Sequence, residues 1–254
     1  TVVFSNEDGG TSTRALMARW GRTTDIEYVY RVDLRTGRAI IQTRDHKDVE
    51  FAGKREGNHP LLIPVTDNNM VADEAPSPVR YQIAPFAGDL SRNSREKVMD
   101  DDPILYRVAS EELVREGKLR PFGVVDGNKI SDPRNYLYVE AQVAVKIAGV
   151  VTLARRRGDP VRRSSAPGRP DYTVDRRGWI RTTVELPPGT RPGDIAEIGF
   201  TCLVVIDSTT KRYPDTGSCA VQAVNKAFLL DQGYRPGASV WSLAEPVEIP
   251  AGII

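Results

Sequence analysis

The feature that most constrains the fold is a long period-two alternation between Tyr136 and Ile147. Residues 136, 138, 140 and 142 are Tyr, Tyr, Glu and Gln, whereas the odd positions from Leu137 onward are apolar. Successive side chains of a β-strand point to opposite faces, so this stretch predicts a strand with one face in a core. Long strands separated by Gly- and Pro-rich turns predict an all-β, mainly antiparallel fold. We expect a two-layer β-sandwich or a jelly roll with one short helix and long loops.

Several other segments carry strand patterns. Ile26–Leu34 alternates with a period of two and, across the Thr36-Gly37 turn, predicts a hairpin with Arg38–Thr43. We expect Val150–Ala154 to pair with Tyr136–Ile147 across Gly149. The remaining expected strands are Leu61–Val65, Val79–Ile83, Trp179–Leu186, Ile195–Ile206 and Val240–Ile249.

The middle of the chain changes character. Ser110 through Gly117 predicts the one short helix, because Ser110 can cap its start and Gly117 can end it. The three carboxylates at 100–102 precede Pro103 and predict a solvated acidic turn, with a metal site as the alternative. Residues 155–178, rich in Arg, Pro, Ser and Gly, predict a long exposed loop. We expect a single β-rich domain over 1–254, with a subdivision near 100–135 as the alternative.

Charge and hydropathy exclude some classes of partner. The 35 basic residues offset 34 acidic ones, leaving a net charge of +1. This balance argues against a nucleic-acid-binding protein, and the arginines of 155–177 lack the repeated aromatic interleaving that would stack on bases. That basic segment is expected to be solvated, with phosphate or an anionic glycan as its alternative ligand. No apolar run reaches the roughly 20 residues that span a bilayer.

The two cysteines bear on where the protein is found. The chain begins at Thr1 without a methionine, which we interpret as removal of a signal peptide or trimming, and we expect a secreted or periplasmic protein. In that setting Cys202 and Cys219 are expected to form a disulfide, which would contribute about 3 kcal/mol. The alternative is two buried free thiols in a cytosolic chain. No feature of the sequence indicates an oligomeric state.

Polar residues that suggest chemistry gather between Trp20 and Asp73. Asp25 and Glu27 are two positions apart, so on a strand they share a face about 6–7 Å apart. Paired carboxylates are the usual catalytic groups of glycoside hydrolysis. A neighbouring Arg22 or Arg31 would keep one of them ionised. The alternative is a solvated strand face with salt bridges.

Both histidines lie in the same stretch. His59 with Asp67, Asn68 and Asn69, and with His46 as a further partner, offers imidazole, carboxylate and amide groups. Such groups ligate divalent metals, and an imidazole oriented by a carboxylate also serves as a general base. Residues 67–69 are equally typical of an Asx turn.

Two further features bear on ligands. The loop Asn6–Thr11 contains Glu7 and Asp8 and resembles a calcium-binding loop without EF-hand spacing, so with Asp67 these are the candidate metal ligands. A plain turn is the alternative. Calcium is the one cofactor that the sequence suggests, and none is certain. Trp20 beside the polar stretch is a candidate for stacking on a sugar ring, the alternative being a packed tryptophan.

Three functions remain open. The first is an exported glycan-cleaving enzyme acting on an oligo- or polysaccharide in a cleft of residues 20–73. Its catalytic candidates are Asp25, Glu27, His59 and Asp67, and its substrate-binding candidates are Trp20, Arg22, His46, Asn68 and Asn69. The second is a non-catalytic glycan-binding or adhesion module. The third is a structural or assembly protein that binds a protein partner. The nucleophile elbow, the nucleotide-binding loops and the His-Glu-x-x-His zinc motif are all missing from the sequence.

Overall fold

The computed structural model describes residues 1–7, 9–73, 77, 79–83, 86–204, 217–249 and 251–252. The chain divides into two compact units. The first unit comprises Thr1–Thr11 and Thr23–Gly88, and the second comprises Ser12–Arg22 and Asp89–Ile254. In sequence the main division therefore falls at Gly88, before the 100–135 stretch. The expectation of one domain over 1–254 stays a prediction.

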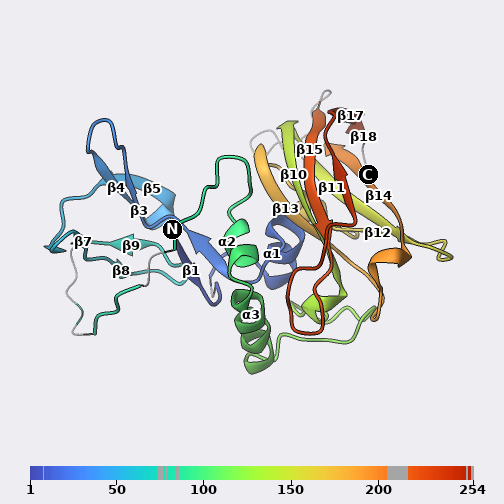
Figure 1. The fold of residues 1–254 in the computed structure, drawn as a ribbon, viewed down its shortest axis with the longest axis horizontal. Helices are drawn as coiled ribbons and strands as arrows, with labels where there is room; N and C mark the ends of the chain where they lie inside the picture. The colour runs from blue at the N-terminus through green and yellow to red at the C-terminus, as the bar shows by residue number, and fades with distance from the viewer. Residues whose placement is uncertain are drawn as a thin grey trace. The chain divides into compact units, whose positions relative to one another are not determined.

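The second unit is a β-sandwich (Figure 1). One sheet has the strand order β13 (Gly178–Glu185), β10 (Tyr136–Lys146), β15 (Ser218–Phe228) and β16 (Trp241–Leu243), with β17 (Val247–Ile249) also paired to β15. The other has the order β12 (Arg162–Ser164), β11 (Ala148–Arg156), β14 (Ile195–Val204) and β18 (Ala251–Gly252). Neighbouring strands are antiparallel except β14 and β18, which are parallel. This mainly antiparallel β-sandwich confirms the predicted fold class.

The apolar core of the second unit lies between its two sheets. Leu137, Val139 and Ala141 of β10 are fully buried and pack with Val150 of β11 and Cys202 of β14. The predicted alternation along Tyr136–Ile147 is therefore confirmed over β10. Its other face, which carries Tyr136, Tyr138 and Glu140, is also buried. A strand with both faces covered occupies a central position, and β10 lies between β13 and β15.

The predicted pairing of Val150–Ala154 with Tyr136–Ile147 is wrong. β10 pairs with β13 and β15, whereas β11 pairs with β12 and β14 in the opposite sheet. Ile147, between the two strands, has a left-handed backbone with φ of 48°. The chain turns here from one layer of the sandwich into the other, so consecutive strands do not form a hairpin.

The central strand β15 was not anticipated. Its pairing with β10 shifts register between Gln142 and Val143 and again between Glu140 and Ala141, so that Gln222 and Asn225 are extra residues on β15. Each β-bulge adds one residue to a strand and breaks its alternation. The buried positions Val221, Val224 and Ala227 are consequently spaced by three, which hides the period-two pattern.

Among its described residues, the second unit has three α-helices: α1 (Thr13–Trp20), α2 (Lys97–Asp101) and α3 (Ile104–Arg115). Short 3₁₀ turns lie at Pro133–Asn135, Pro170–Tyr172 and Pro192–Asp194. α1 was not predicted, although its caps are in the sequence. Ser12 Oγ accepts a hydrogen bond from the N–H of Ala15 at 3.3 Å, and Gly21 ends the helix with φ of 61°.

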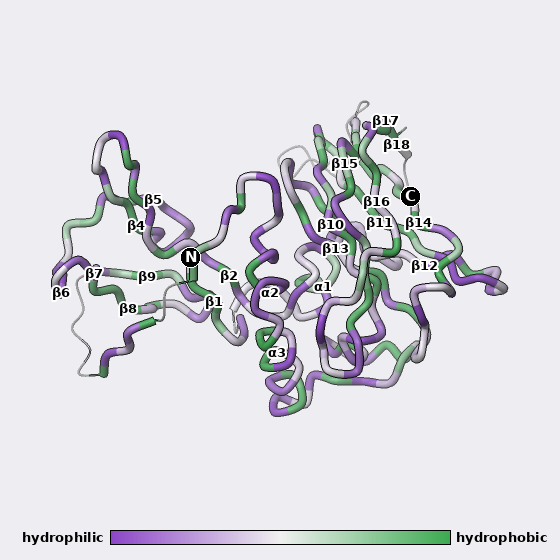
Figure 2. Tube along the Cα trace, in the orientation of Figure 1, coloured by the Kyte–Doolittle hydropathy of each residue, from purple (hydrophilic) through white to green (hydrophobic). Residues whose placement is uncertain are grey.

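The predicted start of the one expected helix is wrong. α3 begins at Ile104, and Ser110 lies buried inside it, where its hydroxyl donates to the carbonyl of Tyr106 at 2.8 Å. Hydrophobic and hydrophilic residues alternate along α3 in Figure 2. The helix stops at Arg115, and Gly117 follows with φ of 63°, as expected for a glycine after a C-terminus.

Two segments expected to be exposed are folded instead. Residues 100–101 end α2, and Asp100 is largely buried, so the prediction of a solvated acidic turn is wrong at this position. Residues 155–178 are not one long exposed loop, since they include the end of β11, β12 and the buried Tyr172 and Val174. Four of the eight arginines of this segment form ion pairs: Arg155 and Arg162 with Glu197, Arg163 with Asp159, and Arg169 with Asp171.

The first unit consists of short strands and a 3₁₀ turn at Arg44–His46. Its strands are β1 (Val2–Phe4), β2 (Asp25–Glu27), β3 (Tyr30–Val32), β4 (Ala39–Thr43), β5 (Lys47–Glu50), β6 (Arg55–Glu56), β7 (His59–Pro60), β8 (Ile63–Pro64) and β9 (Val71–Ala72). β1 pairs with β2, β3 with β4 and β5, β6 with β7, and β8 with β9, all antiparallel.

Two strand predictions in the first unit have different outcomes. The hairpin around Thr36-Gly37 is confirmed as β3 and β4. The expected strand Ile26–Leu34 is interrupted at residues 28–29, and the part before the interruption, β2, pairs with β1 instead. The prediction of a strand at Val79–Ile83 is wrong, because these residues have no strand partner in the described part of the chain.

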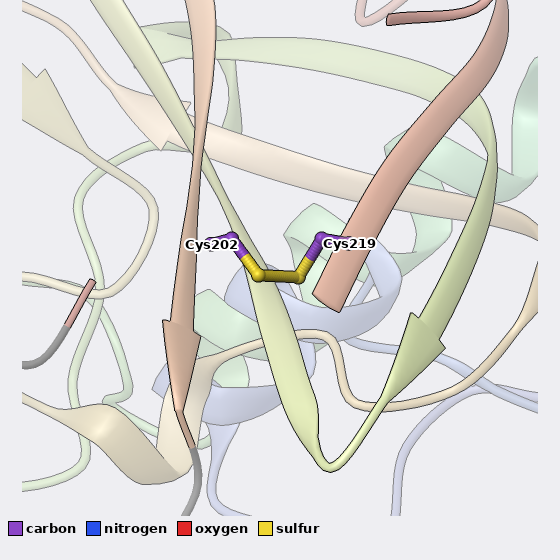
Figure 3. The surroundings of a disulfide bond; sticks show 2 residues. All are labelled: Cys202 and Cys219. Carbon is purple, nitrogen blue, oxygen red and sulfur yellow. A yellow bond between two sulfur atoms is a disulfide. The ribbon is translucent and has the colours of Figure 1, made fainter. Parts of the chain in front are cut away.

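The predicted disulfide is present. Cys202 of β14 and Cys219 of β15 are bonded, with their Cα atoms 5.7 Å apart (Figure 3). Because β14 and β15 belong to different sheets, the bond joins the two layers of the sandwich. Among the described residues, we found no helix with the length and apolar character of a membrane span.

Candidate functional site

The predicted carboxylate pair lies on β2 but is not exposed. Asp25 and Glu27 retain 2% and 8% of their accessible surface. Asp25 Oδ2 accepts a hydrogen bond from Asn69 Nδ2 at 2.9 Å. Two carboxylates that act on a glycosidic bond must flank the substrate on an open face. Both carboxylates are buried in this structure, and their predicted catalytic role stays a prediction.

Two loops meet at Asn69. Its Nδ2 donates to Asp25 and also to the backbone carbonyl of Asn6 at 3.1 Å. Asn69 has a left-handed backbone with φ of 60°, and Thr66 Oγ1 lies 2.7 Å from Asn68 Oδ1. The N–H of Asn69 donates to the carbonyl of Thr66 at 3.0 Å, so residues 66–69 form a turn that is closed by the backbone. The turn thus anchors the N-terminal loop and β2, and Asp67 stays exposed beside it.

The histidines lie on separate hairpins. His46 is exposed in the turn between β4 and β5, with φ of 55°. His59 is exposed on β7, opposite Glu56 of β6. Glu7 accepts a hydrogen bond from the N–H of Thr11 at 3.1 Å, and Asp8 lies outside the described residues. Across the residues that the structure describes, no three His, Cys, Asp or Glu side chains are grouped to hold a metal ion.

Trp20 and Arg22 belong to the second unit. The Trp20 ring is stacked against two guanidinium groups, with Arg19 Cζ 4.7 Å and Arg176 Cζ 4.8 Å from the ring centroid. Arg22 Nε donates to Glu96 Oε1 at 3.1 Å, and both side chains are buried. Arg22 therefore pairs with a carboxylate that the sequence did not single out.

An open groove of about 490 Å³ lies in the first unit. Its apolar lining includes Val2, Phe4, Val29, Leu61, Leu62 and Val71. Its polar lining is Glu56, His59, Arg80 and Gln82. Arg80 forms an ion pair with Glu56, so these two charges offset each other. Ligand sites are typically concave and mostly apolar with a few polar groups, and this groove has that character. Of the predicted residues, His59 alone lines it.

One part of the groove lining is a segment outside any sheet. Val79, Tyr81 and Ile83 are 57%, 87% and 63% exposed, and they alternate with Arg80 and Gln82. Within the described part of the chain, the backbone of 80–83 makes no hydrogen bond. Large apolar side chains that stay exposed side by side are typical of interaction surfaces.

The second unit also has an open groove, of about 820 Å³, between α3 and residues 231–235. Its lining mixes Arg107, Glu111, Asp231 and Arg235. Tyr234 there has a left-handed backbone with φ of 61° and lies under Arg134, whose Cζ is 4.7 Å from the ring centroid. These charges of both signs are exposed and give this groove no single chemical preference.

A buried ion cluster on β10 and β13 is the main feature that the sequence analysis missed. Arg181 of β13 is opposite Glu140 of β10, and both are completely buried. Arg181 Nη2 donates to Glu140 Oε2 at 2.6 Å, and its Nη1 donates to Asp100 Oδ1 at 2.9 Å and to the Tyr106 hydroxyl at 2.8 Å. Lys226 of β15 donates to Asp100 as well. Asp100 of α2 and the Tyr106 hydroxyl of α3 therefore link these helices to the sheet through Arg181.

Electrostatics in this cluster favour the charged forms of Asp100 and Glu96. Burial alone would raise the pKa of Asp100, but Arg181 and Lys226 outweigh it and hold that pKa below its ordinary value. Burial would likewise raise the pKa of Glu96, and Arg22 with Arg181 lowers it. Burial raises the pKa of Tyr106 well above its ordinary range. The cluster has no path to solvent at Arg181 or Glu140, so we assign it to folding.

The pattern of β10 offered one indication of this cluster. Glu140 interrupts an otherwise uncharged run between Tyr136 and Val145, and Arg181 interrupts β13 in the same way. A lone charge inside a strand with apolar flanks requires a partner when buried.

Comparisons with protein-family models, curated proteins and solved structures find no match to this chain.

Proposed function

We propose that this chain is an exported, non-catalytic binding protein that takes a protein partner into the groove of its first unit. The observation that carries the proposal is the contrast between burial and exposure in that unit. The groove is apolar and open, and Tyr81 beside it is 87% exposed, whereas Asp25 is 2% exposed. Exposed apolar and aromatic groups favour association, and buried carboxylates do not favour turnover.

Export is part of the proposal. The Cys202–Cys219 bond is the supporting observation, because disulfides form and persist mainly in oxidising compartments. The bond supports a secreted or periplasmic location. The same setting suits a protein whose task is adhesion or assembly.

Glycan binding is the second candidate. Tyr30 and Tyr81 line the groove beside Arg80, Gln82 and Glu56, and sugar rings stack on aromatic faces with polar groups around them. This candidate keeps the ligand class that the sequence suggested. It uses the groove as a binding site in place of catalytic Asp25 and Glu27.

The test screens the full-length chain against two classes of ligand in parallel. Immobilised protein is screened against a displayed peptide library and a glycan array, and bound glycans are analysed by mass spectrometry for cleavage. We expect peptides to be selected and no glycan product to form. Selection of glycans alone favours the second candidate, and release of shortened glycans overturns the non-catalytic proposal.

A matched pair of variants locates the binding. Leu62→Glu places a charge in the groove lining, whereas Leu34→Glu places one on a 95% exposed leucine of the same unit. A buried charge next to an apolar ligand costs far more than a solvated one. Selected peptides should lose binding to the first variant and keep it to the second. Equal loss in both would remove the groove from the proposal.

A further inference from the structure

Residues 79–83 have the sequence of a β-strand without its partner. Val79, Tyr81 and Ile83 are residue types enriched in strands, and they alternate with Arg80 and Gln82. The pattern predicts a strand, yet the structure leaves these five residues outside every sheet of the described chain. Each side chain from Val79 to Ile83 is exposed.

The backbone of this segment is open to pairing. In the described part of the chain, the N–H of Val79 bonds to Ser77 Oγ at 3.2 Å, while the backbone N–H and C=O groups of 80–83 have no protein partner. Unpaired backbone groups in an extended segment form a template for another strand. Peptide recognition by strand addition uses such groups for affinity and side-chain pockets for specificity.

Residues 80–83 of this segment line the groove. Residues 80–83 form one part of its lining, and the apolar residues Phe4, Val29 and Leu61 form another. A strand placed in the groove would therefore have the backbone of 80–83 beside it and apolar side chains beneath every second residue. The volume of about 490 Å³ is in the range of protein ligand sites.

Charge at the groove indicates a neutral occupant. Arg80 and Glu56 pair with each other, so neither needs a charged group from the ligand. A charged side chain placed against Val2, Phe4 or Leu61 would be desolvated without a partner. The groove therefore matches an uncharged extended peptide better than an acidic or a basic one.

We infer that the partner of this chain enters the groove as an extended, uncharged peptide strand with alternating apolar side chains and pairs with the backbone of 79–83. The inference rests on the proposed function and specifies its chemistry. The segment becomes a paired strand only in the complex, which accounts for a strand pattern that is unpaired in the chain alone. The exposed apolar side chains of 79–83 lose contact with water when the partner binds.

The experiment uses a fluorescein-labelled eight-residue peptide of alternating Thr and Val and the full-length chain, with fluorescence anisotropy as the readout. Amides of a strand point alternately to its two edges. Two N-methylated peptides are prepared, each with the amides of one edge blocked. We expect one of them to bind at least about tenfold more weakly and the other to bind like the parent, because a lost backbone hydrogen bond weakens association.

Variants of the segment provide the matching control. Gln82→Pro and Ile83→Pro each remove one backbone donor, and the two donors face opposite edges. Each is compared with the alanine variant at the same position, which keeps the donor. One proline variant should weaken binding about tenfold relative to its alanine counterpart, and the other should not. All four are expected to keep the thermal midpoint of the parent protein, because both side chains are exposed.

The outcomes separate the inference from the proposed function. If both methylated peptides bind like the parent, side chains alone hold the ligand, and strand pairing is overturned while the groove still binds peptides. If the alternating peptide does not bind but library peptides do, the inference is overturned in the same way. If no peptide binds and Leu62→Glu changes nothing, both the inference and the proposed function are wrong.

Discussion

Strands β10 and β15 of the second unit have 11 residues each, whereas β4, the longest described strand of the first unit, has five. The long strands bury a continuous apolar core, and they bury charge as well, in the Arg181 cluster. The first unit has fewer buried apolar residues among those described and leaves Tyr81 and Ile83 exposed. The second unit therefore has a buried core, whereas the first unit exposes the apolar groups on which the proposed binding depends.

The positions of the tryptophans allow unfolding of the second unit to be followed by itself. Trp20, Trp179 and Trp241 all belong to the second unit, and the first unit has none. Tryptophan fluorescence therefore follows unfolding of the sandwich. The stability of the sandwich can therefore be measured by this fluorescence for each of the variants and conditions below.

The largest expected effect comes from Arg181→Met. The substitution leaves Glu140 and Asp100 without their shared cation in a buried site. Removal of one partner from a buried ion pair costs about 3–5 kcal/mol, so the tryptophan transition in urea should move to much lower denaturant. Arg157→Met, on an exposed side chain of the same unit, should stay within about 0.5 kcal/mol of the parent. Similar behaviour of the two variants would contradict the assigned role of the cluster.

Loss of the disulfide should have the next largest effect. The bond between Cys202 and Cys219 closes a loop with a sequence separation of 17. In the chain-entropy description a loop of that length contributes about 3 kcal/mol. The double variant with alanine at both positions should lower the stability of the tryptophan transition by about that amount. If its urea midpoint equals that of the parent, the bond is not a stabilising link between the sheets.

Acid should weaken the second unit by a smaller, graded amount. Glu96 and Asp100 have folded-state pKa values below their ordinary values of 4.5 and 3.8. A depressed carboxylate pKa contributes stability that is present above the ordinary pKa and is lost as pH falls through the folded-state pKa. Unfolding free energy from tryptophan fluorescence should therefore hold from neutral pH to about pH 5 and decline below about pH 4. A transition independent of pH down to about 3 would show that these carboxylates do not stabilise the fold.

Some of these features were available from the sequence and others were not. The strand β10, the hairpin of β3 and β4, and the cysteine pair follow from period-two alternation, turn residues and cysteine count. The bulges at Gln222 and Asn225 break the period-two alternation, so this pattern does not predict β15. Arg181 and Glu140 are far apart in sequence and meet only through strand register, which no local pattern encodes.

The candidate site shows the same limit. Asp25 and Glu27 do lie on one strand, but spacing along a strand does not say which face is covered, and both proved buried. His59 was singled out and does line the groove, although the metal or general-base chemistry expected for it stays a prediction. The failed strand prediction at Val79–Ile83 marks a segment that has a strand pattern and no strand partner among the described residues.

Hydrogen–deuterium exchange on the free full-length chain tests whether residues 79–83 are an unpaired strand. We expect the amides of 80–83 to exchange at close to the rate of an unstructured peptide, because they have no backbone partner in the described chain. The amides at the centre of β10 and β15 should exchange slowest, since they are paired inside the sandwich. Slow exchange at 80–83 in the free chain would show that the segment is already paired, and the unpartnered strand on which the proposed binding depends would not exist.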